Sequence, residues 1–241
     1  NKFENIFLFF LTFFSSLTIL LSGERSSLFF MLLILFICMI LLDIGFKIKI
    51  IYLLSILFVF ISLLTMNNNL SKRIIFDKNN QLSLNSTNVI IFTPQHTAHY
   101  KTALNIFFDK PIIGQGPKMF RKLCHKKEYN EYVYNFSGCS SHPHNTYIQL
   151  LAETGLISAI LFSLGFFHII INFIRHFLSL IIRKGKKLSN YQILINLTAL
   201  IVFWPFSPSG NFFNNWICIT YAFPLGFYVN EYFSYKKYNK S

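Results

Sequence analysis

The residues best suited to chemistry form one short run, Ser141-His142-Pro143-His144-Asn145-Thr146-Tyr147. Asn145 is a good helix N-cap and Pro143 suits the approach to a first turn, so we expect a helix to begin within a residue or two of His144. The free N–H groups and positive dipole end of that helix attract anions and disfavour an imidazolium. His144 would then be neutral at pH 7 and able to act as a general base, with His142 as the second candidate.

A polar stripe follows these histidines. Asn145, Gln149 and Glu153 recur every fourth residue, so they share one face of the predicted helix. We expect them to support the site along the helix that leads from the histidines toward the bilayer. The alternative interpretation of the run is an ordinary capped helix with a solvated loop histidine.

A second candidate is Arg25, in the charged turn Ser22-Gly23-Glu24-Arg25-Ser26 between two apolar stretches. Its planar guanidinium stays charged and can pair with two phosphate oxygens at once, which makes an arginine at a membrane surface a suitable phosphate ligand. The structural alternative is an interfacial arginine that pairs with Glu24 or reaches lipid headgroups.

Metal binding is a third possibility, because one polar segment contains His96, His99, Cys124, His125, Cys139, His142 and His144. These spacings match no standard zinc framework, and no carboxylate lies between paired histidines, so we expect no metal site. The two cysteines either form a disulfide, if the segment lies outside the cytosol, or remain free thiols. Their spacing leaves both states open.

The scaffold that positions these residues is predicted to lie in a membrane. Of the 241 residues, 53% are hydrophobic and 13% are charged, a balance that a soluble surface could not easily carry. The net charge of +13 falls between apolar stretches rather than along a helix face, so we expect no nucleic-acid partner. Six stretches approach the roughly 20 residues that cross a bilayer: Phe3–Leu21, Ser27–Leu42, Ile50–Met66, Leu156–Ile174, Tyr191–Phe206 and Phe213–Val229.

Basic residues set the expected orientation. Lysines and arginines gather between the second and third spans, between the fourth and fifth spans, and in the C-terminal tail, which places those parts in the cytoplasm. We therefore expect an all-α, polytopic transmembrane bundle of about six spans with a large, partly helical periplasmic loop. Residues 1–66 would contain spans one to three, with an outer turn at 22–26. The loop would comprise residues 67–151. Spans four to six would lie in residues 152–229, and residues 230–241 would form a cytoplasmic tail. Apolar sequence begins almost at residue 1, so we also expect further spans before it.

The loop has local signals of its own. Thr102–Phe108 has the apolar recurrence of a short amphipathic helix. We expect this helix to end at Lys110-Pro111, because a proline disfavours the helical conformation of the residue before it. Gly114-Gln115-Gly116-Pro117 should follow as a turn.

Together these pieces resemble the C-terminal half of the O-antigen ligase and polymerase superfamily of bacterial inner-membrane glycosyltransferases. Three pieces match in order, between about Leu8 and Leu164: the Ser-Gly-Glu-Arg-Ser turn, the helix with Pro111, Gly114-Gln115-Gly116 and Phe120, and the His-Asn run that leads to Glu153-Thr154-Gly155-Leu156. The resemblance implies transfer of a glycan from an undecaprenyl-pyrophosphate carrier to an acceptor hydroxyl at the periplasmic face, without cofactor or metal.

In that chemistry Arg25 would bind the pyrophosphate and His144 would take or orient the hydroxyl proton. Further pyrophosphate contacts are expected from the basic residues Lys101, Lys118 and Arg121. The family often has an arginine before the amphipathic helix where this chain has histidines and a lysine, so His99 or Lys101 is a candidate for the second phosphate contact.

The acceptor distinguishes three enzymes of this superfamily. It is the lipid A core for a ligase, another carrier-linked glycan for a polymerase, and a protein hydroxyl for an O-glycosyltransferase; the sequence does not separate them. A membrane transporter is the alternative from another class. The apolar stretches show neither a mid-span charge nor repeated halves, which a transporter would be expected to have.

Overall fold

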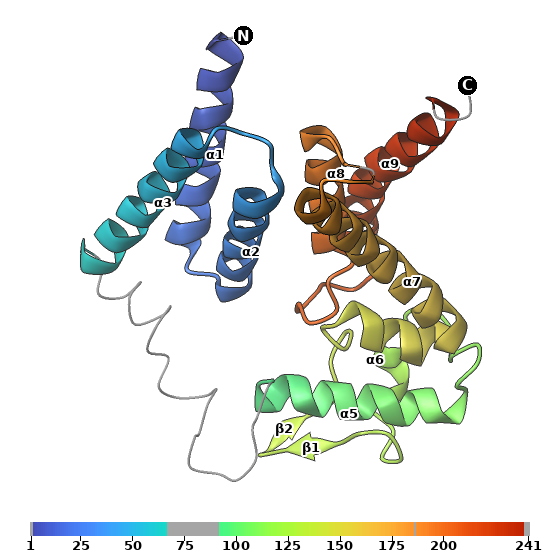
Figure 1. Ribbon diagram of the computed structural model, residues 1–241. Helices are drawn as coiled ribbons and strands as arrows, with labels where there is room; N and C mark the ends of the chain where they lie inside the picture. Colours follow the sequence, from blue (N-terminus) through green and yellow to red (C-terminus); the bar gives the residue numbers. More distant parts are fainter. Residues whose placement is uncertain (1, 67–91, 186, 239–241) are drawn as a thin grey trace. The chain divides into compact units, whose positions relative to one another are not determined.

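A computed structural model describes residues 2–66, 92–185 and 187–238. The first part of the predicted loop, 67–91, the end of the predicted tail, 239–241, and Lys186 lie outside the described residues. The chain divides into two compact units, Asn1–Asn79 and Asn80–Ser241 (Figure 1). The described chain is mostly helical, as expected.

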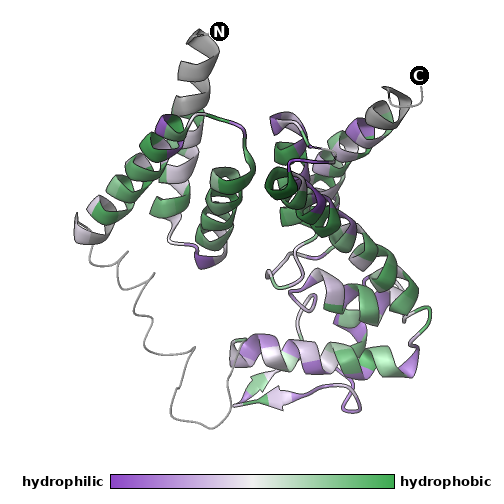
Figure 2. Cartoon of the chain, viewed as in Figure 1, coloured by the Kyte–Doolittle hydropathy of each residue, from purple (hydrophilic) through white to green (hydrophobic). Residues whose placement is uncertain are grey.

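The first unit contains three apolar helices, α1 (Lys2–Ser22), α2 (Arg25–Leu41) and α3 (Phe46–Met66). α1 ends at Gly23, whose φ of 63° is the left-handed conformation that commonly terminates a helix. Leu20, Met31 and Ile56, one from each helix, form the buried core. Outward-facing side chains remain apolar, Phe36 at 64% and Phe58 at 73% exposure, which suits a lipid environment (Figure 2).

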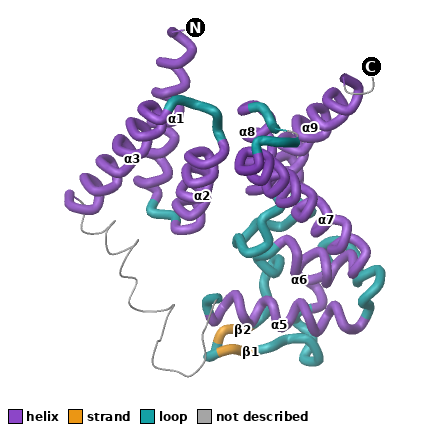
Figure 3. The backbone as a smooth tube through the Cα atoms, in the orientation of Figure 1, coloured by secondary structure: helices purple, strands orange, loops and turns teal. Residues whose placement is uncertain are grey.

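The second unit joins a polar layer to an apolar layer. The polar layer contains α5 (Pro94–Asp109), α6 (Phe120–Leu123) and a hairpin of β1 (Tyr132–Val133) and β2 (Phe136–Ser137), connected by long loops (Figure 3). The apolar layer contains α7 (Thr146–Ile182), α8 (Asn190–Val202) and α9 (Asn215–Tyr238). α9 therefore continues through the first residues of the predicted tail.

The polar layer has its own core and a covalent link. Ala103, Ile106, Phe120 and Ala152 belong to one buried cluster that holds α5, α6 and the first turns of α7 together. Cys124 and Cys139 form a disulfide, the first of the two states that the sequence left open. The predicted end of α5 is confirmed, since Asp109 is its last residue and Lys110 its C-cap.

α5 begins earlier than the pattern predicted, at Pro94 instead of Thr102. Thr93 is its N-cap and accepts a hydrogen bond from the His96 N–H at 3.2 Å, while Pro94 occupies the first turn. Both residues favour a helix start. The extension matters because it brings His96 and His99 onto the helix.

α7 is broken at Gly155, whose φ of 77° and ψ of −173° are not helical. The turn after α5 satisfies the backbone groups that the break leaves free: Gln115 N–H donates to Ala152 O at 3.1 Å and Gly116 N–H to Glu153 O at 2.8 Å. On the far side of the break, Leu156 N–H donates to Pro111 O at 2.8 Å. The Gly114–Gly116 turn and the break at Gly155 are therefore joined by backbone hydrogen bonds, and each segment depends on the other for its conformation.

Only α7 among the described helices is long and apolar enough to cross a membrane by length and composition. α8 has 13 residues, and at about 1.5 Å per residue it is about 20 Å long, short of a hydrocarbon core of about 30 Å. Helices occupy all six predicted stretches, but six crossings remain a prediction.

Candidate active site

His144 lies at the mouth of α7, as predicted. The Asn145 side chain accepts a hydrogen bond from Ile148 N–H at 3.1 Å, which confirms it as the N-cap. His144 itself has a left-handed backbone, with φ of 61°. The turn between α8 and α9 holds this segment in place: Ser209 N–H donates to His144 O at 3.0 Å and Asn145 Nδ2 donates to Pro205 O at 2.7 Å.

Four imidazoles gather at this position. The ring centroid of His144 lies 4.1 Å from that of His142, 5.3 Å from that of His99 and 5.8 Å from that of His96. His96 and His99 come from α5, three residues apart and so on one helix face. His96 also stacks on Tyr100 with the ring planes 8° apart.

Two of these rings are oriented by backbone carbonyls. His142 Nε2 donates to Ser209 O at 3.1 Å, and its Nδ1 then accepts from the Ser141 hydroxyl at 2.8 Å. His99 is buried, and its Nδ1 donates to Gly138 O at 3.1 Å. The His144 ring makes no hydrogen bond within the described part of the chain, so both of its nitrogens are available.

Burial lowers the pKa of three of these rings, those of His96, His142 and His144. The pKa of His144 is lowered to about 4, mainly by burial and then by the nearby imidazoles of His142, His99 and His96 in that order. The pKa values of His96 and His142 are also lowered, in both cases mainly by burial. A neutral His144 was expected from the helix dipole, whereas burial is the larger cause here.

The polar stripe on α7 is buried and connects three elements. Glu153 accepts from Phe120 N–H at 3.0 Å and from Gln149 Nε2 at 2.9 Å, so it fixes the start of α6. Gln149 also donates to Asn211 Oδ1 and accepts from Phe212 N–H, both at 2.9 Å. The stripe therefore joins the base of the histidine cluster to α6 and to the α8–α9 turn.

The predicted basic residues lie in different places. The charge of Arg121, in α6, contributes to the lowered pKa of His142, so Arg121 acts on the cluster. Lys101 and Lys118 are exposed, and neither makes a polar contact with a histidine ring in the described residues. Arg25 is exposed at the first position of α2 in the other unit, and its convergence with His144 remains a prediction.

Sequence reasoning missed two parts of the cluster. His96 was considered only as a metal ligand, and His99 only as a metal ligand or a phosphate contact. Thr93-Pro94 is a helix-start signal that would have placed both on one face of a longer α5. The contribution of Ser209 has no comparable signal, because it depends on the α8–α9 turn meeting a segment more than sixty residues away.

Residues 10–163 match the family described as O-antigen ligase, which is more than half of the chain. The chain belongs to this O-antigen ligase family. Comparison with curated proteins and with solved structures gave no match. The matched residues run from α1 through the break in α7, and so include Arg25, the Gly114–Gly116 turn and the histidine cluster.

One set of possible metal ligands is present among the described residues of this O-antigen ligase family member. Ligand atoms of Cys124, His125 and Cys139 lie within 4.8 Å of one another. Both sulfurs belong to the disulfide, however, and a disulfide sulfur is not the thiolate that zinc binds. This set does not include the four clustered histidines.

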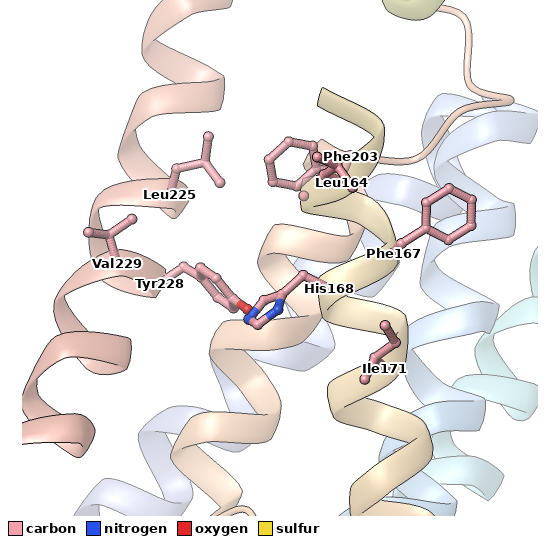
Figure 4. A pocket seen from close by; sticks show the side chains of 9 residues that line it. Leu164, Phe167, His168, Ile171, Phe203, Leu225, Tyr228 and Val229 are labelled. Carbon is pink, nitrogen blue, oxygen red and sulfur yellow. The ribbon is translucent and has the colours of Figure 1, made fainter. Parts of the chain in front are cut away.

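The apolar layer contains a separate cavity of about 660 Å³ (Figure 4). It lies among α7, the end of α8 and α9, and its lining includes Leu164, Phe203 and Val229. His168 and Tyr228 are its polar side chains, with ring centroids 6.2 Å apart. The cavity lacks a lysine or arginine, so it does not suit a pyrophosphate, and the histidine cluster remains the candidate active site.

Proposed function

We propose that this chain carries the transfer site of a membrane enzyme that moves a glycan from undecaprenyl pyrophosphate to an acceptor hydroxyl, with the lipid A core as acceptor, as in an O-antigen ligase. Family membership supports a glycan-transfer enzyme of this type. The observation that carries the proposal is the half-buried His144, whose pKa is lowered to about 4 and whose ring nitrogens are available at the mouth of α7.

In the proposed reaction, a lone pair on His144 takes the proton of the acceptor hydroxyl. The oxygen forms a bond to the anomeric carbon of the donor glycan. The bond from that carbon to the pyrophosphate oxygen breaks, and its electrons leave with undecaprenyl pyrophosphate. Protons and charge therefore balance without a metal or a nucleotide.

The leaving group gains negative charge as that bond breaks, so fixed positive charges near it lower the barrier. We assign the main pyrophosphate contact to Arg25, with Arg121, Lys101 and Lys118 as further contacts. Arg121 is the best supported of the last three, because its charge reaches His142. Asn145, Gln149 and Glu153 would position His144 rather than touch substrate, and His142 would be the second base candidate.

The proposed location is the bacterial inner membrane, with six spans in this chain and the site facing the periplasm. The apolar exposed faces of α1 to α3 and the length of α7 support membrane insertion. A periplasmic site is consistent with the Cys124–Cys139 disulfide, since disulfides persist in that compartment. The partners would be the lipid-linked donor, the acceptor glycan and membrane lipids.

Gene deletion with complementation tests this proposal. Wild type, His144→Ala, Arg25→Ala and the control His125→Asn, which changes an exposed histidine of the same segment, would each be expressed as the full-length protein. We expect wild type and the control to restore polysaccharide on lipid A, and both alanine variants to lose at least about 100-fold of it.

The products left in the deletion strain separate the acceptors. Long chains that stay on the carrier indicate a ligase, single repeat units indicate a polymerase, and loss of glycan from proteins alone indicates an O-glycosyltransferase. Unchanged polysaccharide and protein glycosylation in the deletion strain and with every variant would refute the transferase function.

A further inference from the structure

His99 is a buried histidine whose second ring nitrogen has no partner. Its side chain is 2% exposed, and its Nδ1 lies 3.1 Å from Gly138 O. A carbonyl oxygen only accepts, so Nδ1 carries a proton, and in that tautomer the lone pair lies on Nε2. This Nε2 is buried without a hydrogen bond, a condition that only Asn211 Nδ2 shares among the described side chains. An unsatisfied buried acceptor is unfavourable, so a donor should reach it in the working site.

The His144 ring is the donor best placed to do so. Its centroid lies 5.3 Å from that of His99 with the planes 33° apart, and a rotation of the ring would turn a nitrogen toward His99 Nε2. The backbone of His144 is held by Ser209 N–H, so the ring can turn while the main chain stays in place. His142 cannot serve as readily, because both of its nitrogens already have partners. A substrate hydroxyl has no open path to this buried atom.

We propose that His99 is a positioning residue for His144. With substrate in the site, the His144 ring donates its N–H to His99 Nε2, and this fixes the other His144 nitrogen as the lone pair that faces the acceptor hydroxyl. After that nitrogen takes the hydroxyl proton, the imidazolium keeps its hydrogen bond to His99, which stabilises the charge that forms. This inference rests on the proposed function, because it assigns His99 a role in the same transfer step.

Two substitutions separate the two nitrogens of His99. In His99→Asn the amide reaches the position of Nδ1 and can still donate to Gly138, but nothing replaces Nε2. In His99→Gln the amide oxygen reaches the position of Nε2 and can accept from His144, while the bond to Gly138 is lost. A structural role of His99 depends on Nδ1, whereas the proposed role depends on Nε2.

The assay uses the full-length enzyme in liposomes, with carrier-linked glycan and lipid A core purified from the deletion strain. We expect His99→Asn to lower kcat at least about tenfold with KM for the donor nearly unchanged, because orientation of the base acts on the chemical step. We expect His99→Gln to stay within about threefold of wild type, although its melting temperature should fall because a buried hydrogen bond is lost. His125→Asn is the matched control.

A double variant tests the route through His144. If His99 acts only on that base, adding His99→Asn to His144→Ala should cause no further loss. Full kcat in His99→Asn together with an inactive His99→Gln would overturn the proposal, because the bond to Gly138 would then be the part that matters. An additional loss in the double variant would also overturn it. Wild type without transfer would instead defeat the proposed function, whereas active wild type and inactive His144→Ala with unaffected His99→Asn would defeat this inference alone.

Discussion

Gly155→Ala should break the link between the polar layer and the membrane helix. A Cβ on this residue would lie 2.2 Å from Ile112 O, far inside van der Waals contact, and the backbone has φ of 77° and ψ of −173°. That conformation is almost restricted to glycine, and for alanine it costs about 1–3 kcal/mol. Relief of the clash must also move the turn whose N–H groups bond to Ala152 and Glu153, at about 1 kcal/mol for each hydrogen bond. We expect a loss of about 3–5 kcal/mol.

The assay is thermal unfolding of the full-length protein in detergent, followed by transfer activity. Gly226→Ala is the matched control, because a Cβ there has no atom within 4 Å and the residue lies inside α9. We expect Gly155→Ala to lower the melting temperature by several degrees and to reduce transfer, since Glu153 then no longer holds the start of α6. Gly226→Ala should leave both unchanged. Equal melting temperatures for the two variants would show that the break at Gly155 does not couple the layers.

Three further predictions concern the loop. The rate of transfer should remain high well below pH 6.5 and fall only as pH approaches about 4, because the pKa of His144 is lowered to that value. A half-loss near pH 6.5 in a rate profile would contradict the lowered pKa of His144. Folding should weaken over the same range, since the unfolded chain takes up protons on its histidines below pH 6.5 that the buried rings do not, and melting temperature against pH measures this. Reduction of the Cys124–Cys139 disulfide, which closes a loop of sequence separation 15, should cost about 3 kcal/mol. Melting curves with and without dithiothreitol check that loss, and unchanged curves would argue against the bond.

The sequence predicted the parts of the site that depend on neighbours along the chain. Asn145 caps α7, and α5 ends before Pro111, because capping and proline geometry act over a few residues. The predicted fourth span began at Leu156, which is where the apolar part of α7 starts after the break. The break itself had no local signal beyond one glycine, since it requires the Gly114–Gly116 turn to supply its hydrogen bonds.

Contacts between distant segments could not be predicted in the same way. The cluster needs α5 to lie against the segment before α7, about forty residues later, and the α8–α9 turn to bind both His142 and His144. No periodic pattern in the sequence predicts these long-range contacts. The main cause of the lowered His144 pKa was missed for the same reason, because burial is a property of the folded site and the dipole is a property of one helix.

The cationic side chains and the histidine rings of the second unit differ in their exposure to solvent. Arg121, Lys101 and Lys118 are exposed, while the rings of His96, His142 and His144 are half-buried and have lowered pKa values. In the proposed reaction these two kinds of group have different tasks, since a pyrophosphate needs a charge that does not depend on pH and an acceptor hydroxyl needs a base with a free lone pair. A buried lysine in place of an imidazole would repel the charge that forms on the base. It follows that acid pH should slow the chemical step while donor binding, measured through KM, changes little.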